Sequence, residues 1–132
     1  MPLPVTAFFA GVLSLWIIFL LSRVVRLRRR HRILMGSGPE NEAERAIRGH
    51  ANATETIPVF LILMGLAEGF ATPAWLLVLI ALLFTAGRIM HGLHFLTDQA
   101  PLTTRTGGMV LTISPIVLLS LGAIGHALLS LL

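Results

Sequence analysis

Two long stretches of this chain contain no charged residue, and they constrain its fold more than any other feature. The first spans residues 5–22 and the second spans residues 107–132. At 1.5 Å per residue, the first would form a helix of about 27 Å, close to the thickness of the hydrocarbon core of a bilayer. Stretches of this kind predict membrane-spanning helices, so the chain is expected to be an integral membrane protein.

Two further hydrophobic segments complete an all-α bundle. Residues 75–87 are charge-free, and their helix is expected to continue through Arg88. The segment at about 51–71 has the weakest hydropathy because it contains an asparagine and two glutamates, and Pro58 is expected to kink its helix. The sequence therefore predicts a single four-helix transmembrane domain over residues 1–132, with spans at about 5–22, 51–71, 75–96 and 107–131.

The connections on the charged side are expected to be loops. The stretch that begins at Arg23 is interpreted as a loop, followed by a helix start at Pro39 with Glu40 in its first turn. Residues 97–106, which include Asp98 and Arg105, are interpreted as a second polar loop. Glu68, at the opposite end of its segment, is interpreted as a solvated residue at the membrane interface.

The positions of the arginines predict the topology. All ten basic residues are arginine, and they follow the first span, precede the second, end the third or precede the fourth. By the positive-inside rule this side is cytoplasmic, with both termini on the periplasmic side. The pI near 11.6 could suggest nucleic acid. Because the arginines lie beside a membrane span, we expect anionic membrane lipid as their partner and no nucleic acid.

Polar residues form one stripe on each of the two middle helices. On a helix of 3.6 residues per turn, the first stripe falls within about 80°; it comprises Arg45, Arg48, Asn52 and Glu55. The second falls within about 60°; it comprises Phe84, Arg88, His91 and Phe95. A charged side chain costs about 2.5 to 3.5 kcal/mol at mid-membrane, so both stripes must face protein or water. We expect them to meet across a helix interface, with Arg105 closing the top.

These residue types suit a small zwitterionic ligand with more negative than positive charge. Arginines can hold carboxylates through two parallel hydrogen bonds, while Glu55 can bind an ammonium group or position Arg48. A nearby arginine also favours the thiolate form of a thiol. Because the chain has no cysteine, that thiol must belong to the ligand. Glutathione combines all of these features, so it is the expected cosubstrate.

Other interpretations of the same residues remain open. The intramembrane glutamate and arginines could pair only to assemble an oligomer, or could bind a small anion in a protein without catalytic activity. Glu55 could also carry protons in a small exporter, although that mechanism does not need the arginines. His91 and His94 have a spacing that could ligate a metal, but no carboxylate or cysteine completes the set, so no metal site is predicted.

Two segments resemble a known family. The pattern Arg48, Asn52, Glu55 and Pro58 resembles the second-helix signature of the membrane-associated proteins in eicosanoid and glutathione metabolism, the MAPEG family. The segment from Gly87 to Phe95 resembles the third-helix motif of that family, and the likeness covers nearly the whole chain in length, spans and loop placement. Eukaryotic members often have tyrosines where this chain has Thr56 and Phe95, and the chain contains no tyrosine.

The resemblance implies a homotrimer that binds glutathione between subunits near the cytoplasmic side. It implies that Arg48, Asn52 and Glu55 bind glutathione, that Arg88 and His91 line the site, and that Arg105 activates the thiol. The implied activity is that of a glutathione transferase or peroxidase acting on lipophilic electrophiles. The short chain and the arginine-rich first connection resemble bacterial members, which implies an inner membrane location.

Overall fold

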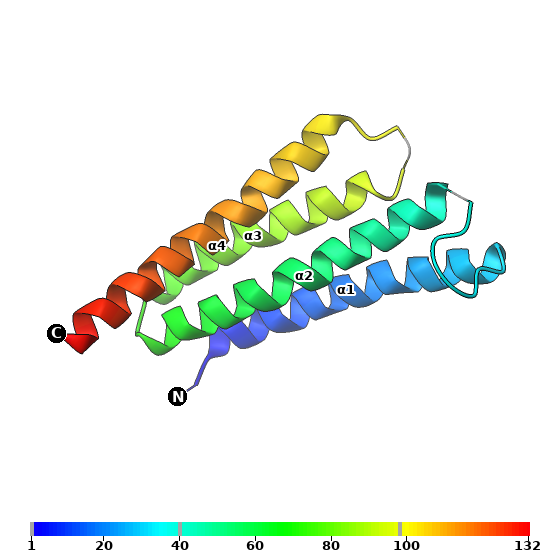
Figure 1. The fold of residues 1–132 in the computed structure, drawn as a ribbon. Coiled ribbons are helices and arrows are strands. Elements are labelled where there is room, and N and C mark those ends of the chain that lie inside the picture. Colours follow the sequence, from blue (N-terminus) through cyan, green and yellow to red (C-terminus); the bar gives the residue numbers. More distant parts are fainter. Residues whose placement is uncertain (1, 40, 98) are drawn as a thin grey trace.

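The described part of the chain folds into four long helices. The computed structural model describes residues 2–39, 41–97 and 99–132, and its helices are α1 (Pro4–Arg30), α2 (Asn41–Gly69), α3 (Ala74–His94) and α4 (Leu102–Leu131). Successive helices run in opposite directions, so both termini lie at one end and the α1–α2 and α3–α4 connections lie at the other (Figure 1). The predicted all-α four-helix bundle is confirmed. Glu40 and Asp98 lie outside the described residues.

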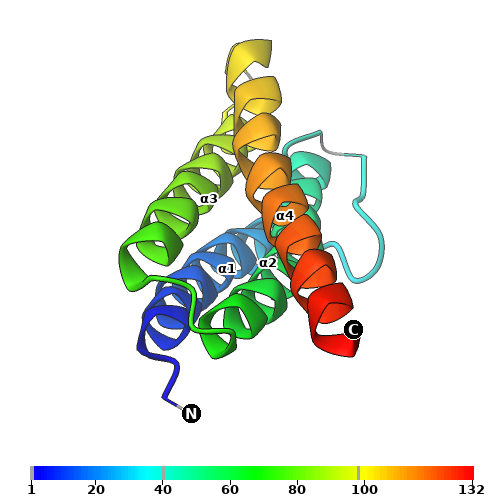
Figure 2. The same ribbon diagram turned by 90° about the vertical axis from the view of Figure 1, so that its left-hand side faces the viewer.

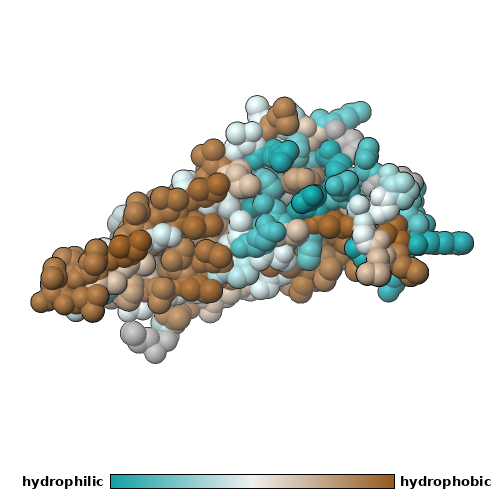
Figure 3. Space-filling view, viewed as in Figure 1, coloured by the Kyte–Doolittle hydropathy of each residue, from teal (hydrophilic) through white to brown (hydrophobic). Residues whose placement is uncertain are grey.

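Among the described residues, three of the helices are long and apolar enough to cross a membrane. They are α1, α3 and α4. Helix α1, for example, has 27 residues and is therefore about 40 Å long at 1.5 Å per residue. Helix α2, whose span has the weakest predicted hydropathy, is as long as its neighbours but is not among these three. Hydrophobic residues cover the end that holds the termini, and hydrophilic residues gather toward the end that holds the two connections (Figure 3). The chain is therefore an integral membrane bundle with one polar end.

Two helix boundaries differ from the sequence prediction. Helix α1 continues to Arg30, through a segment that was predicted to be a loop. Arginine is a good helix former, and neither glycine nor proline follows until Gly36, so charge alone does not end the helix. Helix α4 begins at Leu102, directly after Pro101, so Arg105 lies in its first turn and not in a loop. In both segments a polar composition, which by itself predicts a loop, is compatible with a helix that leaves the membrane.

The bundle packs as two helix pairs, with α1 mainly against α2 and α3 mainly against α4 (Figure 2). At its centre the rings of Phe60 and Phe84 stack, with centroids 3.8 Å apart and planes inclined by 4°. Glycines bring α3 and α4 close together. A Cβ atom added at Gly87 would lie 2.8 Å from the Cβ of Leu111, and one added at Gly108 would lie 2.7 Å from the backbone nitrogen of His91. These small residues allow backbone contact, as is common between membrane helices.

Glu68 is a helix cap and not simply a solvated interfacial residue. Its Oε1 accepts a hydrogen bond from the backbone N–H of Val5 at 2.9 Å, and its Oε2 accepts one from Thr6 at 2.8 Å. The residue that precedes α1, Leu3, supplies no side-chain cap. A carboxylate from α2 therefore satisfies two N–H groups that would otherwise lack partners, and it lies at the positive end of the α1 dipole.

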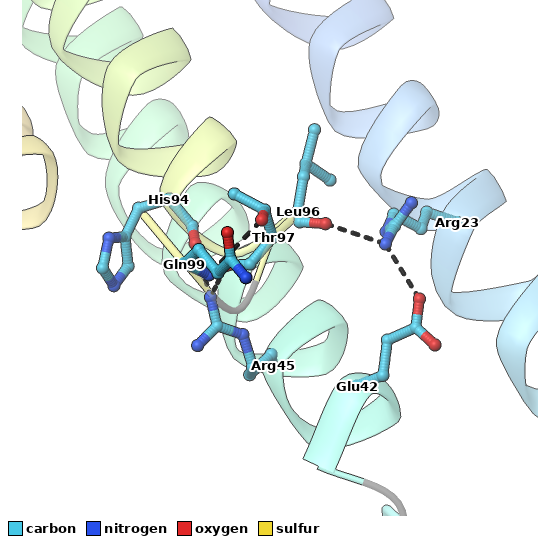
Figure 4. A network of polar contacts seen from close by, with 7 residues as sticks. All are labelled: Arg23, Glu42, Arg45, His94, Leu96, Thr97 and Gln99. Carbon is cyan, nitrogen blue, oxygen red and sulfur yellow. Dashed lines mark hydrogen bonds and ion pairs between the residues drawn. The ribbon is translucent and has the colours of Figure 1, made fainter. Parts of the chain in front are cut away.

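Two arginines hold the opposite end of the bundle together (Figure 4). Nη2 of Arg23 in α1 lies 3.0 Å from Oε1 of Glu42 and donates to the carbonyl oxygen of Leu96 at 3.0 Å. Nη2 of Arg45 in α2 donates to the carbonyl oxygens of His94, at 2.7 Å, and Thr97. Cations are favourable at the negative end of a helix dipole, so these contacts tie the end of α3 to α1 and α2.

Candidate functional site

A cleft of about 780 Å³ opens at the polar end of the bundle. Its walls come from α2, α3 and α4, and they consist of Asn41, Glu44, Arg45, Arg48, Ala51, Asn52, Glu55, His91, Phe95, Arg105 and Met109. The volume lies within the range of about 300–1,000 Å³ that is typical of small-molecule sites. Because the lining mixes arginines, carboxylates, an amide and an imidazole, the cleft suits a polar and charged ligand.

Five of the six predicted site residues line this one cleft. They are Arg48, Asn52, Glu55, His91 and Arg105. The side chains of Arg48, Glu55 and Arg105 are exposed, Asn52 is half-buried and His91 is buried. The two stripes therefore meet across the α2–α3 interface, and the first turn of α4 brings Arg105 to the same space.

Arg88 does not line the cleft but lies behind it. Its side chain is 0% exposed. One guanidinium nitrogen, Nη1, donates to Oδ1 of Asn52 at 2.8 Å and lies 3.4 Å from Oγ1 of Thr112, while Nη2 lies 3.2 Å from Nδ1 of His91. The sixth predicted residue is therefore connected to the cleft through two residues that do line it.

Three charged residues of the cleft, Arg48, Glu55 and Arg105, form no ion pair with one another. Within the described ranges the ion pair found is Arg23–Glu42, so Glu55 pairs there with neither Arg48 nor Arg88. The side chains of Arg48 and Arg105 likewise make no hydrogen bond to the described residues. Cationic and anionic groups thus border the same open space, as a zwitterionic ligand would require.

Close helix contacts fix the walls of the cleft. A Cβ atom at Gly49 would lie 2.9 Å from the Cβ of Phe95, so the glycine lets this ring lie against the backbone of α2. Gly108 likewise lets the backbone of α4 lie against the backbone of His91. In addition, Nδ1 of His94 lies 3.1 Å from Oγ1 of Thr104 in α4. The α3 wall is therefore held from both neighbouring helices.

Sequence reasoning missed several residues of the cleft. Glu44 lies one helical turn before Arg48, and Asn41 lies about one turn before Glu44, so their spacing could have added them to the α2 stripe. Met109 lies one turn after Arg105, but a helical register for this pair could be seen only once α4 was known to begin at Leu102.

Comparison with known proteins identifies the family. The chain is 36% identical over 92 residues to the inner membrane protein YecN of Escherichia coli strain K12, which covers 68% of this chain and 70% of that protein. The identity and coverage are the same for YecN of Escherichia coli O6:H1. Residues 6–125 match the MAPEG family pattern. On the four-helix fold, the polar cleft and this match, the chain belongs to the MAPEG family.

Proposed function

We propose that the protein is a glutathione-dependent membrane enzyme of the transferase or peroxidase type. The observation that supports this most is the convergence of Arg48, Asn52, Glu55, His91 and Arg105 on one cleft at the polar end of a membrane bundle. Membership of a family associated with glutathione and eicosanoid metabolism makes glutathione the first ligand to test. Its second substrate is a lipophilic electrophile that reaches the cleft from the bilayer.

Each charged group of glutathione has a residue of opposite charge in the cleft. Arg48 is exposed and makes no hydrogen bond to the described residues, so its guanidinium can take a ligand carboxylate through two parallel hydrogen bonds. Glu55 is one helical turn beyond Asn52 and can receive the ligand ammonium group. Asn52 and His91 line the same cleft, and each can donate a hydrogen bond to the second carboxylate of the tripeptide.

Arg105 supplies positive charge for the reacting sulfur. A cation near the thiol favours its thiolate, and each unit by which the thiol pKa falls corresponds to about 1.4 kcal/mol. The thiol proton leaves to solvent, the sulfur lone pair forms a bond to the electrophilic carbon, and the leaving group departs with its electron pair. Because the chain contains no tyrosine, no phenolic hydroxyl shares this task with the arginine.

The exposed face of α2 supports a homotrimer. Glu55 is exposed in the single chain, and Val59, Ile62 and Leu66 follow it on the same face with exposed fractions of 47%, 65% and 45%. Lipid does not solvate a carboxylate, and the three apolar residues beside it suit contact with protein, so we propose that other copies of the chain cover this face. The glutathione cleft then lies at the boundary between subunits.

The charge distribution supports an inner membrane location with the arginines in the cytoplasm. The relative YecN is named as an inner membrane protein, and all ten arginines lie on one side of the bundle or in its adjoining half. This orientation follows the positive-inside rule, and it places both termini in the periplasm and the cleft toward cytoplasmic glutathione.

The absence of tyrosine favours one second candidate, a membrane protein that binds a small anion without catalysis. The remaining possibility is that the charges serve only for oligomer assembly, in which Glu55, in no ion pair within the described residues, would pair with another copy of the chain.

Thermal stability in detergent tests binding, and a conjugation assay tests catalysis. Millimolar glutathione should raise the melting temperature, and Glu55→Gln should remove most of that shift. With an aryl halide, Arg105→Ala should lower kcat by about 10- to 100-fold and reduce the ultraviolet absorbance of bound thiolate. Bound glutathione without conjugate would favour the anion-binding candidate, and unchanged activity in Arg105→Ala would remove this arginine from the mechanism.

A further inference from the structure

The environment of Arg88 is unusual for a cation inside a membrane bundle. Its guanidinium is fully buried, and its partners are an amide oxygen, a hydroxyl and an imidazole nitrogen, from Asn52, Thr112 and His91. The ion pair found in the described part of the chain, Arg23–Glu42, does not involve it. A buried charge without a carboxylate is costly to fold, so this cost points to a role beyond packing.

The direction of each hydrogen bond around Arg88 is determined by chemistry. A guanidinium has only donors, so Oδ1 of Asn52 and Nδ1 of His91 must both accept. Thr112 accepts as well, because its hydroxyl hydrogen is already donated to the carbonyl oxygen of Gly108 at 2.7 Å. Neutral His91 therefore carries its proton on Nε2, and the amide of Asn52 turns its NH₂ group away from Arg88.

Those two remaining groups belong to residues that line the cleft. Neither Nδ2 of Asn52 nor Nε2 of His91 has a hydrogen-bond partner among the described residues, and neither is among the sealed, unpartnered polar atoms there. Both groups can donate and, in these orientations, neither can accept. The cleft wall formed by Asn52 and His91 therefore presents N–H donors, and the buried positive charge of Arg88 lies directly behind them.

We infer that Arg88 is a positioning residue, which orients Asn52 and fixes the tautomer of His91 so that both donate to a ligand carboxylate. Arg88 does not touch the ligand; it sets the polarity of the two side chains that do. The inference rests on the proposed function only in taking glutathione as the source of that carboxylate. The orientation of the two side chains follows from the contacts of Arg88 alone.

Nitrogen NMR of the histidine-labelled protein tests the tautomer without any ligand. The His91 signals are assigned by their loss in His91→Gln, and at neutral pH we expect a protonated Nε2 and an unprotonated Nδ1. Arg88→Met should give a mixture of tautomers, and Arg88→Lys should partly restore the single form. A wild-type ring with its proton on Nδ1 would overturn the inference even if Arg88→Met did not fold, and so would a tautomer that Arg88→Met leaves unchanged.

A matched pair of substitutions tests the amide. Asn52→Asp replaces the NH₂ group with an acceptor of similar size and gives Arg88 an ion-pair partner, so the melting temperature should hold or rise. Glutathione affinity should fall at least about tenfold, as expected for losing a hydrogen bond to a charged group. Asn41→Asp adds the same charge to the exposed rim of the cleft and should have a smaller effect.

The outcomes separate this inference from the proposed function. Equal affinity in Asn52→Asp and the wild type would overturn the assigned donor role. A wild-type chain that shows the Nε2 tautomer, dependent on Arg88, but binds no glutathione would support the positioning role and contradict the proposed function. Glutathione binding together with the Nδ1 tautomer would do the reverse.

Discussion

The fold treats two glutamates of α2 in opposite ways, one at the end of the helix and one at its middle. At the end that holds the termini, both oxygens of Glu68 accept hydrogen bonds from the first turn of α1. At the middle of α2, Glu55 is exposed, lines the cleft and pairs with no cation among the described residues. The carboxylate of Glu68 therefore stabilises the fold, while the carboxylate of Glu55 is available to a ligand or to another copy of the chain.

The arginines of the polar end divide in the same way. Arg23 and Arg45 are bound to carbonyl oxygens at the end of α3, where they hold three helices together. Arg48 and Arg105 face the cleft without hydrogen bonds to the described residues. Charge in a membrane protein therefore does not identify a site by itself; the informative groups are those whose hydrogen-bonding capacity the fold leaves unused.

Removing a cleft arginine should give the largest effect. Arg48→Met should weaken glutathione binding by about 2 to 3 kcal/mol, the contribution of hydrogen bonds to a charged group. The reason is that the guanidinium can no longer donate two parallel hydrogen bonds to a ligand carboxylate. Its melting temperature without ligand should be unchanged, since the side chain is exposed. Isothermal titration calorimetry measures the affinity, with Arg29→Met in the exposed arginine cluster as the control. A large loss of stability in Arg48→Met would mean that the fold does use this cation.

The two ends of α4 should respond differently to one added methyl group. Gly108→Ala places a Cβ 2.7 Å from the backbone nitrogen of His91 and should cost about 1 to 3 kcal/mol through overpacking. Gly125→Ala, near the other end, has no atom within 4 Å of the new Cβ and should be neutral. Thermal unfolding in detergent measures both. Equal effects would show that α3 and α4 do not pack closely behind the cleft.

Glu68→Gln and Glu55→Gln form the direct test of the two glutamates. Glu68→Gln leaves an NH₂ group facing a backbone N–H at the start of α1, so it should cost about 0.5 to 2 kcal/mol of stability, as loss of a helix cap does. Glu55→Gln should leave thermal stability unchanged and reduce the effect of glutathione. The comparison fails if Glu55→Gln is the less stable of the two variants.

Periodicity and hydropathy predicted most of the fold, for a physical reason. Charge-free stretches such as 5–22 and 107–132 have few alternatives to a membrane helix, and the bundle has helices over both. The helix ends at Arg30 and Leu102 could not be predicted, because polar residues suit both a loop and a helix that leaves the membrane. The cap formed by Glu68 could not be found either, since it depends on how α1 lies against α2.

The cleft was predictable in part because helical spacing places side chains on faces. The stripe that contains Arg48, Asn52 and Glu55 follows from spacing alone, and the structure places all three in one cleft. Spacing could not show whether Arg88 points into that cleft or lies behind it, because both positions belong to the same face of α3. That distinction depends on the depth of packing, and Asn52 and His91 lie between this arginine and the open space.

The smallest expected effect comes from the ion pair at the polar end. Arg23 and Glu42 are 31% and 42% exposed, so Glu42→Gln should cost about 0.2 to 1 kcal/mol, less as salt is added. Arg23 keeps its hydrogen bond to the carbonyl of Leu96, which holds the end of α3 without the carboxylate. Glu44→Gln, exposed in the first turn of the same helix, loses the same interaction with the helix dipole but no ion pair, so it should cost less than Glu42→Gln. Thermal unfolding measures the loss of stability in Glu42→Gln and in Glu68→Gln. Equal losses would show that the exposed ion pair stabilises the fold as much as the helix cap does. The polar end would then depend on its charges for folding as much as the other end does.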